Sequence, residues 1–173
     1  MARAPAYVCA PYAAELPEVR RWHVDRATLI ARIGIADGLA PLLVHRNIGP
    51  LFGEEETPAS RAIGLDCDEV LVEAVARRTN GVFLALFRDD GTASAGMLQE
   101  WGAWTRVRGL MRREISGPGV RLGRWIDWRN AAQRAGLALA WEDLVDPPLV
   151  RPADPVPLVS PHTEANLRRA RIR

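Results

Sequence analysis

A serine, a glycine and a glutamate stand at short intervals in the segment Ser94-Ala95-Gly96-Met97-Leu98-Gln99-Glu100. The residues before this segment, 82–87, are all apolar and predict a buried strand, and the residues from Ala95 onward have the spacing of a helix. The three residues therefore lie where a strand ends and a helix begins. In open α/β sheets, ligands bind at this edge, beyond the carboxyl ends of the strands.

Each of these three residues has a property that suits a phosphorylated ligand. A helix N-terminus offers unpaired backbone N–H groups and a partial positive charge, which favour phosphate. Ser94 adds a hydroxyl there, and Gly96 lacks the Cβ that would keep a phosphate or sugar away from the backbone. Glu100 follows Gly96 by four residues, so the two share a helix face on which an attached sugar would lie.

Glu100 stands on a stripe of small and apolar residues. The other members of this stripe are Gly96, Ala103, Trp104 and Val107. A carboxylate alone on such a face costs free energy unless it is paired or used, so we expect a functional role for Glu100. Ser94 is also a suitable N-cap for the helix, and both the cap and the ligand contact remain open.

The elements that must position this turn alternate along the chain. Predicted strands cover residues 7–10, 41–45, 82–87 and 137–141, and predicted helices cover residues 18–36, 59–78, 95–113 and 122–135. Such alternation favours an α/β domain with a flavodoxin-like (Rossmann-like) parallel sheet of about four to five strands and helices on both faces. In that strand order the first and third strands are neighbours, so the loop of Pro11 and Tyr12 comes beside residues 88–96.

The length of the chain favours one domain, which we expect over residues 6–145. A proline-rich tail that ends in arginines follows at residues 146–173, and we expect it to be extended or disordered. Residues 46–57 form a longer connection than usual, which suggests a binding loop or lid. No apolar run reaches the roughly 18 residues of a membrane span. The N-terminus lacks a signal-peptide core, so we expect a cytoplasmic protein.

The composition excludes several kinds of chemistry. All 23 basic residues are arginine, so no lysine is available for a Schiff base. The net charge of +2 gives no large basic field for binding nucleic acid. Cys9 and Cys67 have neither CxxC nor zinc spacing, and the three histidines stand far apart. We therefore expect two buried thiols, no metal site and no cofactor.

The segment from Ser94 to Glu100 resembles the S-x-G-x-x-x-E signature of the nucleoside 2-deoxyribosyltransferase-like superfamily. It is most similar to the nucleotide-hydrolysing branch and to small phage and bacterial members of unknown function. The opening Tyr7-Val8-Cys9-Ala10-Pro11-Tyr12 resembles the first strand and loop of that family, and residues 61–78 resemble its helix before the third strand. The resemblance covers residues 6–113.

By this resemblance, Glu100 is the nucleophile that attacks C1′ and expels the base. Water or a second base then resolves the glycosyl-enzyme, as in a retaining glycosidase. The resemblance implies that Ser94 holds a 5′-phosphate, which favours nucleoside 5′-monophosphates and hydrolysis. It also implies an acidic residue in the preceding helix that contacts the sugar or base; Asp68 is the candidate, and Glu73 competes with it.

Two further residues complete the candidate substrate-binding set. Tyr12 stands in the first loop, and Asp90 lies in Asp89-Asp90-Gly91, whose first role is a turn. A second class of function remains open, namely a nucleotide-binding sensor or accessory protein on the same fold without turnover. In both cases the expected partner is a small nucleotide or nucleoside, not nucleic acid or a membrane.

The resemblance also implies a homo-oligomer, because sites in that family are often completed by a neighbouring subunit. Four tryptophans stand at helical spacing in two of the predicted helices, and they are Trp101, Trp104, Trp125 and Trp128. We expect them to pack in a core or at a dimer face and not to stack on a base.

Overall fold

Four parallel strands form the centre of the computed structural model, which describes residues 2–12, 17–47, 57–88, 90–109 and 119–137. The strands are β1 (Ala4–Cys9), β2 (Leu39–Leu42), β3 (Val82–Phe87) and β4 (Val120–Arg124). Their order in the sheet is β2-β1-β3-β4, and all three pairings are parallel. This confirms the flavodoxin-like α/β class, with β1 and β3 as neighbours.

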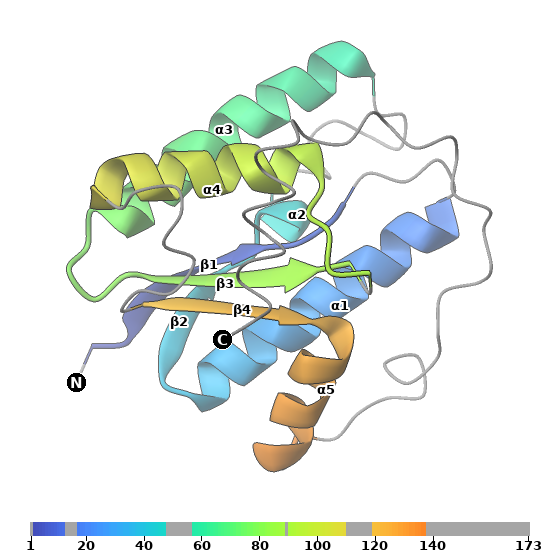
Figure 1. The fold of residues 1–173 in the computed structure, drawn as a ribbon, viewed down its shortest axis with the longest axis vertical. Coiled ribbons are helices and arrows are strands. Elements are labelled where there is room, and N and C mark those ends of the chain that lie inside the picture. Colours follow the sequence, from blue (N-terminus) through green and yellow to red (C-terminus); the bar gives the residue numbers. More distant parts are fainter. Residues whose placement is uncertain (1, 13–16, 48–56, 89, 110–118, 138–173) are drawn as a thin grey trace.

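The helices lie on both faces of this sheet. They are α1 (Pro17–Ala36), α2 (Val44–Asn47), α3 (Pro58–Ala76), α4 (Ala95–Arg108) and α5 (Trp125–Arg134). Helices α1 and α5 cover one face, and α3 and α4 cover the other (Figure 1). Among the described residues, no helix combines the length and apolar character needed to cross a bilayer.

The alternation of side chains along the strands divides the core in two. On β1, Val8 points to the α1/α5 face, whereas Tyr7 and Cys9 point to the α3/α4 face. On β3, Leu84 lies in the α1/α5 core and Phe83 in the α3/α4 core. Because both faces are covered, all of these positions are buried, which explains why β3 is apolar throughout.

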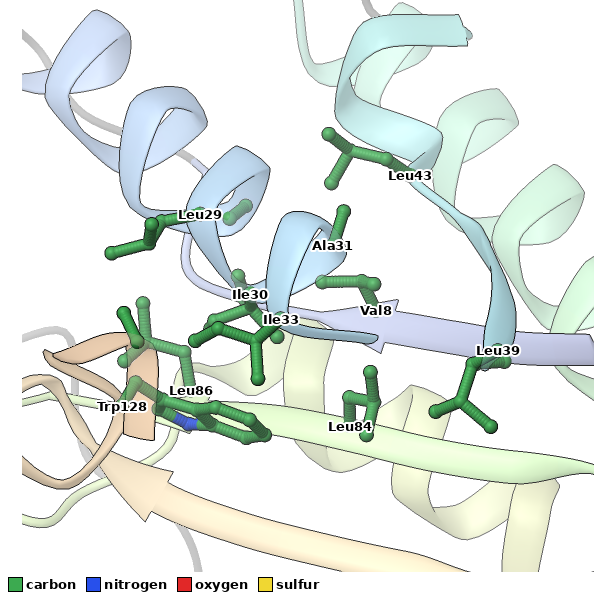
Figure 2. Close-up of a cluster of buried hydrophobic side chains, with 14 of the residues drawn as sticks. Val8, Leu29, Ile30, Ala31, Ile33, Leu39, Leu43, Leu84, Leu86 and Trp128 are labelled. Carbon is green, nitrogen blue, oxygen red and sulfur yellow. The ribbon is translucent and has the colours of Figure 1, made fainter. Parts of the chain in front are cut away.

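The core on the α1/α5 face is mostly aliphatic. Figure 2 shows Ile30 and Ile33 of α1 close to Leu84 and Leu86 of β3, with the Trp128 ring of α5 beside them. The Trp128 Nε1 donates a hydrogen bond to the carbonyl oxygen of Ala85 at 3.0 Å, so its polar atom is paired although it is buried. A Cβ on Gly123 would lie 3.1 Å from Nε1 of that ring, so this glycine gives the ring its room.

The core on the α3/α4 face is more aromatic. The Phe83 ring lies 5.9 Å from the Tyr7 ring, 5.4 Å from the Trp101 ring and 5.2 Å from the Trp104 ring, measured between centroids. Trp104, Trp125 and Trp128 are buried, and the half-buried Trp101 packs against the α3/α4 core. The predicted packing of the tryptophans in a core is therefore confirmed.

Several predicted elements were wrong in their bounds. The first strand runs over Ala4–Cys9 and not over residues 7–10, because Ala4, Pro5 and Ala6 pair with β2. The second strand ends at Leu42, and Val44–Asn47 form a short helix where we expected the strand to continue to residue 45. The helix predicted from residue 122 begins at Trp125, because residues 120–124 pair with β3 as a strand. The Asp127 carboxylate accepts a hydrogen bond from the backbone N–H of Arg124 at 2.9 Å and so fixes the start of α5.

Other predicted boundaries fall partly outside the described residues. Helix α4 ends at Arg108, earlier than the predicted residue 113, because Gly109 adopts a left-handed conformation with φ of 63°. The predicted strand at 137–141 and the division between residues 6–145 and 146–173 concern residues beyond 137, which the structure does not describe. Most of the predicted 46–57 loop is likewise outside the description.

Candidate functional site

Helix α4 begins where the sequence predicts, and Ser94 is its N-cap. The Ser94 Oγ accepts a hydrogen bond from the backbone N–H of Met97 at 3.3 Å. A Cβ on Gly96 would lie 3.2 Å from the Leu65 side chain of α3. The missing side chain of Gly96 therefore allows α3 and α4 to approach each other, which gives this glycine a packing role.

Glu100 lies on the buried face of α4, with 3% of its surface exposed. Its Oε2 has no hydrogen-bond partner among the residues that the structure describes. Burial raises the pKa of the Glu100 carboxyl to about 8, and the Cys9 thiol lowers it as a donor. The charge of Asp68 raises this pKa, and the Tyr7 hydroxyl lowers it. The expectation that this carboxyl does not face solvent is therefore confirmed.

Asp68 approaches the same place from α3. It is 9% exposed, and within the described part of the chain its Oδ1 has no hydrogen-bond partner. Burial raises the pKa of the Asp68 carboxyl to about 6. Glu73, the competing candidate, instead forms ion pairs with Arg77 at 2.9 Å and Arg106 at 3.1 Å. The structure thus brings Asp68, and not Glu73, into electrostatic range of Glu100.

Two residues of β1 belong to this cluster, although the sequence analysis did not assign them to it. Tyr7 and Cys9 are almost fully buried, and burial, followed by the charge of Glu100, raises the pKa of each. The Tyr7 hydroxyl lies near enough to the Glu100 carboxyl to lower its pKa. Neither Tyr7 Oη nor Glu100 Oε2, however, forms a hydrogen bond of normal geometry within the described residues. The alternation of a strand places both residues on one face and was the available signal.

A small cavity lies beside this cluster, and Cys9 is part of its lining. It has a volume of about 30 Å³, which corresponds to the space of about one water molecule. Its walls are apolar and come from β1, β3, β4, α4 and the turn before it, and the lining residues are Cys9, Phe83, Ala85, Phe87, Ala93, Met97, Leu98, Trp101 and Leu122. Glu100 is not among these residues, so its carboxyl lies closed off behind β1 and α3 in this conformation.

The other two predicted substrate-binding residues have local roles. The Asp90 Oδ1 accepts hydrogen bonds from the backbone N–H of Thr92 at 2.8 Å and from its hydroxyl at 2.7 Å, which confirms the turn. The Tyr12 carbonyl oxygen lies 3.3 Å from Nδ1 of His23 in α1. Burial lowers the pKa of His23, and this carbonyl raises it, whereas the charges of two arginines lower it further.

Of the two cysteines, only Cys9 is buried as expected, because Cys67 is half-buried. Within the described ranges, no group of three or more His, Cys, Asp or Glu side chains could hold a metal ion. The side chain of His45 and the whole of His162 lie outside the description.

The fold and this cluster define the class of the protein: a parallel α/β domain with two buried carboxyl groups between β1, α3 and α4. Compared with protein-family models, with curated proteins and with solved structures, the chain finds no match.

Proposed function

We propose that this protein cleaves or transfers the N-glycosidic bond of a nucleoside or nucleoside 5′-monophosphate, with Glu100 as the nucleophile at C1′. One observation carries the proposal. Glu100 and Asp68, from two different helices, meet in the interior, and each has an oxygen without a hydrogen-bond partner. Glycosidic bond cleavage commonly uses two such carboxyl groups. The likeness of residues 94–100 to the deoxyribosyltransferase signature supports the same chemistry.

The protonation of the pair bears on its mechanism. With pKa values of about 8 for Glu100 and about 6 for Asp68, the buried pair shares about one proton at neutral pH. A nucleophile must be ionised, and burial opposes this, whereas the Tyr7 hydroxyl and Cys9 thiol favour it. Entry of a ligand with water reduces the burial, so the pKa of Glu100 moves toward its ordinary value and the carboxyl ionises.

The steps then follow those of a retaining glycosidase. The ionised Glu100 forms a bond to C1′ as the bond from C1′ to the base nitrogen breaks, and the base leaves with a proton from solvent or from Asp68. Water, which gives a proton to Asp68 or to solvent, or a second base then attacks C1′. The bond from C1′ to the Glu100 oxygen breaks, and Glu100 leaves as a carboxylate. We assign to Asp68 the assistance of both steps, which is supported by its effect on the pKa of Glu100.

A second function is favoured by one specific observation. Glu100 is 3% exposed, and the cavity lined in part by its neighbour Cys9 holds about 30 Å³, far less than a nucleotide. A sensor or accessory protein that binds a nucleotide at the edge of the sheet, without turnover, would keep its carboxyl pair closed in this way.

The decisive experiment measures free base. The protein is incubated with a panel of ribo- and deoxyribonucleosides and their 5′-monophosphates, and chromatography detects released base. We expect release from at least one of them, its loss in Glu100→Gln, and slower release in Asp68→Asn. Glu69→Gln and Asp66→Asn change partly or fully exposed carboxylates on α3 and are matched controls that should keep full activity.

Three outcomes decide between the possibilities. Full activity in Glu100→Gln refutes the assignment of the nucleophile. Binding of a nucleotide without release of base from any substrate identifies the sensor, and the absence of both binding and release removes both functions.

A further inference from the structure

Cationic and aromatic side chains gather where β1 ends, on the α1 side of the sheet. The His23 Nδ1 lies 3.3 Å from the carbonyl oxygen of Tyr12, and the Arg20 guanidinium carbon lies 5.7 Å from the centre of the Tyr12 ring. The Trp22 and His23 rings are 5.3 Å apart. The contacts of His23 and Arg20 hold Tyr12, three residues after the end of β1, against the first two turns of α1.

Arg88 adds a positive charge from the neighbouring strand. It directly follows β3, which runs parallel to β1, so both chains leave the sheet at the same edge. Its charge reaches His23 and contributes to the lowered pKa of that imidazole. The Arg88 side chain is exposed, and its guanidinium forms no hydrogen bond or ion pair within the described parts of the chain.

A second arginine near His23 is fixed in a different way. The buried Arg26 guanidinium stacks on the Trp22 ring at 3.2 Å and on the Trp125 ring at 4.3 Å, measured to the ring centres. Among the described carboxylates close by in the sequence, Asp25 pairs with Arg46 at 4.0 Å, Asp90 accepts from Thr92, and Glu18 is exposed in the first turn of α1. The guanidinium groups of Arg20 and Arg88 bring positive charge to this corner of the sheet edge from two different elements.

We propose that the guanidinium groups of Arg20 and Arg88, with the His23 imidazole as a hydrogen-bonding neighbour, bind the phosphate monoester of the ligand at the crevice between β1 and β3; these three residues are here called the cationic corner. Guanidinium groups bind phosphate through paired, charge-assisted hydrogen bonds, and an exposed one is available for a ligand. The crevice at the strand-order reversal between β1 and β3 is where ligands bind in such sheets.

This inference rests on the proposed function, which supplies the base and the sugar of the ligand. It narrows the substrates of the protein from nucleosides and nucleoside 5′-monophosphates to the 5′-monophosphates. It also moves the phosphate away from Ser94, whose hydroxyl already accepts the Met97 N–H. The phosphate would lie on the α1 side of β1, and the sugar would extend over the end of β1 toward Glu100. The two ends of the ligand would thus meet groups of opposite charge.

Binding titrations by calorimetry test this assignment without requiring turnover. The titrants are the common nucleoside 5′-monophosphates, the matching nucleosides, and inorganic phosphate as a probe that is independent of the base. We expect Arg88→Gln and Arg20→Gln each to weaken monophosphate and phosphate binding about 10- to 100-fold, the value of a lost charged hydrogen bond, with nucleoside binding unchanged. Arg21→Gln, an exposed neighbour on α1, is the matched control and should bind as the wild type does.

Thermal unfolding of each variant verifies that it is folded, and Arg88 is exposed enough for its replacement to be tolerated. Wild-type affinity for monophosphates in both Arg88→Gln and Arg20→Gln overturns the cationic corner, as does equal affinity of the wild type for a monophosphate and its nucleoside. These results are distinct from failure of the proposed function, which would show as bound monophosphate with no release of base.

Discussion

The two faces of the sheet bury different chemistry behind the same strands. On the α1/α5 face, aliphatic side chains from α1, β1 and β3 pack together (Figure 2). The buried Trp128 Nε1 there has a carbonyl partner. On the α3/α4 face, an aromatic core surrounds Glu100 and Asp68, which both keep an oxygen without a partner. Successive residues of β1 supply both environments.

The two faces therefore contribute to stability with opposite signs. Each buried aliphatic side chain on the α1/α5 face stabilises the fold by about 1.5–3 kcal/mol. Each carboxyl on the α3/α4 face costs free energy, because burial without a partner is unfavourable and ionisation makes it more so. Retained buried carboxyls that destabilise the fold are a common mark of a functional site.

Truncation on the α1/α5 face should have the largest effect on stability. Leu84 is buried in the middle of β3, so Leu84→Ala should lower the free energy of unfolding by about 2–5 kcal/mol. Ile63 of α3 is 54% exposed, and Ile63→Ala should change it by no more than about 0.5 kcal/mol. Urea denaturation measures both, and a cost for Leu84→Ala as small as that of Ile63→Ala would contradict the packing described here.

The parts of the fold that local pattern determines could be predicted from the sequence. The apolar run at residues 82–87 predicted both ends of β3 correctly, and the cap at Ser94 predicted the first residue of α4 correctly. The stripe around Glu100 predicted its burial because helix periodicity alone decides which residues share a face. The parallel order followed from the alternation of strands and helices.

The remaining features depend on contacts between distant segments. Strand β4 has few strand-forming residues and is defined by pairing with β3, so its sequence favoured a helix. The sequence of α3 alone could not decide whether Asp68 or Glu73 is the residue beside Glu100. The position of α4 decides it, because Arg106 of α4 pairs with Glu73 and leaves Asp68 as the inward carboxyl. That Tyr7 lies near Glu100 and Asp68 could not be predicted, because it depends on how β1 packs against α4 and α3.

The stability of the wild-type protein should fall as the pH rises, and Glu100→Gln should remove most of the fall. The pKa of Glu100 is about 8 in the folded protein and near 4.5 when unfolded, so the folded state retains its proton longer. Its contribution is fully present below the unfolded pKa and is lost as the pH rises through the folded one. Between pH 5 and pH 8 the loss should be on the order of 3 kcal/mol.

Urea denaturation at several pH values gives the free energy of unfolding of the wild type and of Glu100→Gln, and their difference measures this effect. The lowered pKa of His23 contributes with the opposite sign, but equally in both proteins, so it cancels in the difference. The pKa of Asp68 is also raised, to about 6, so Asp68 likewise makes stability fall as the pH rises. The free energy of unfolding of Glu100→Gln should therefore still fall, by less and at lower pH. Parallel profiles for the wild type and Glu100→Gln would show that Glu100 is not buried in solution.

The smallest effect on stability should come from Ser94, which caps α4, the helix that carries Glu100. Ser94→Ala should lower the free energy of unfolding by about 1 kcal/mol, because it removes the acceptor for the Met97 N–H. Ser94→Asp should keep most of that stability, since a carboxylate caps the helix and interacts favourably with its dipole. Denaturation and monophosphate titration of the same two variants separate the cap from a ligand contact. If Ser94 only caps α4, Ser94→Asp binds the monophosphate as the wild type does; if Ser94 holds the phosphate, the added negative charge repels it and affinity falls although the helix is intact.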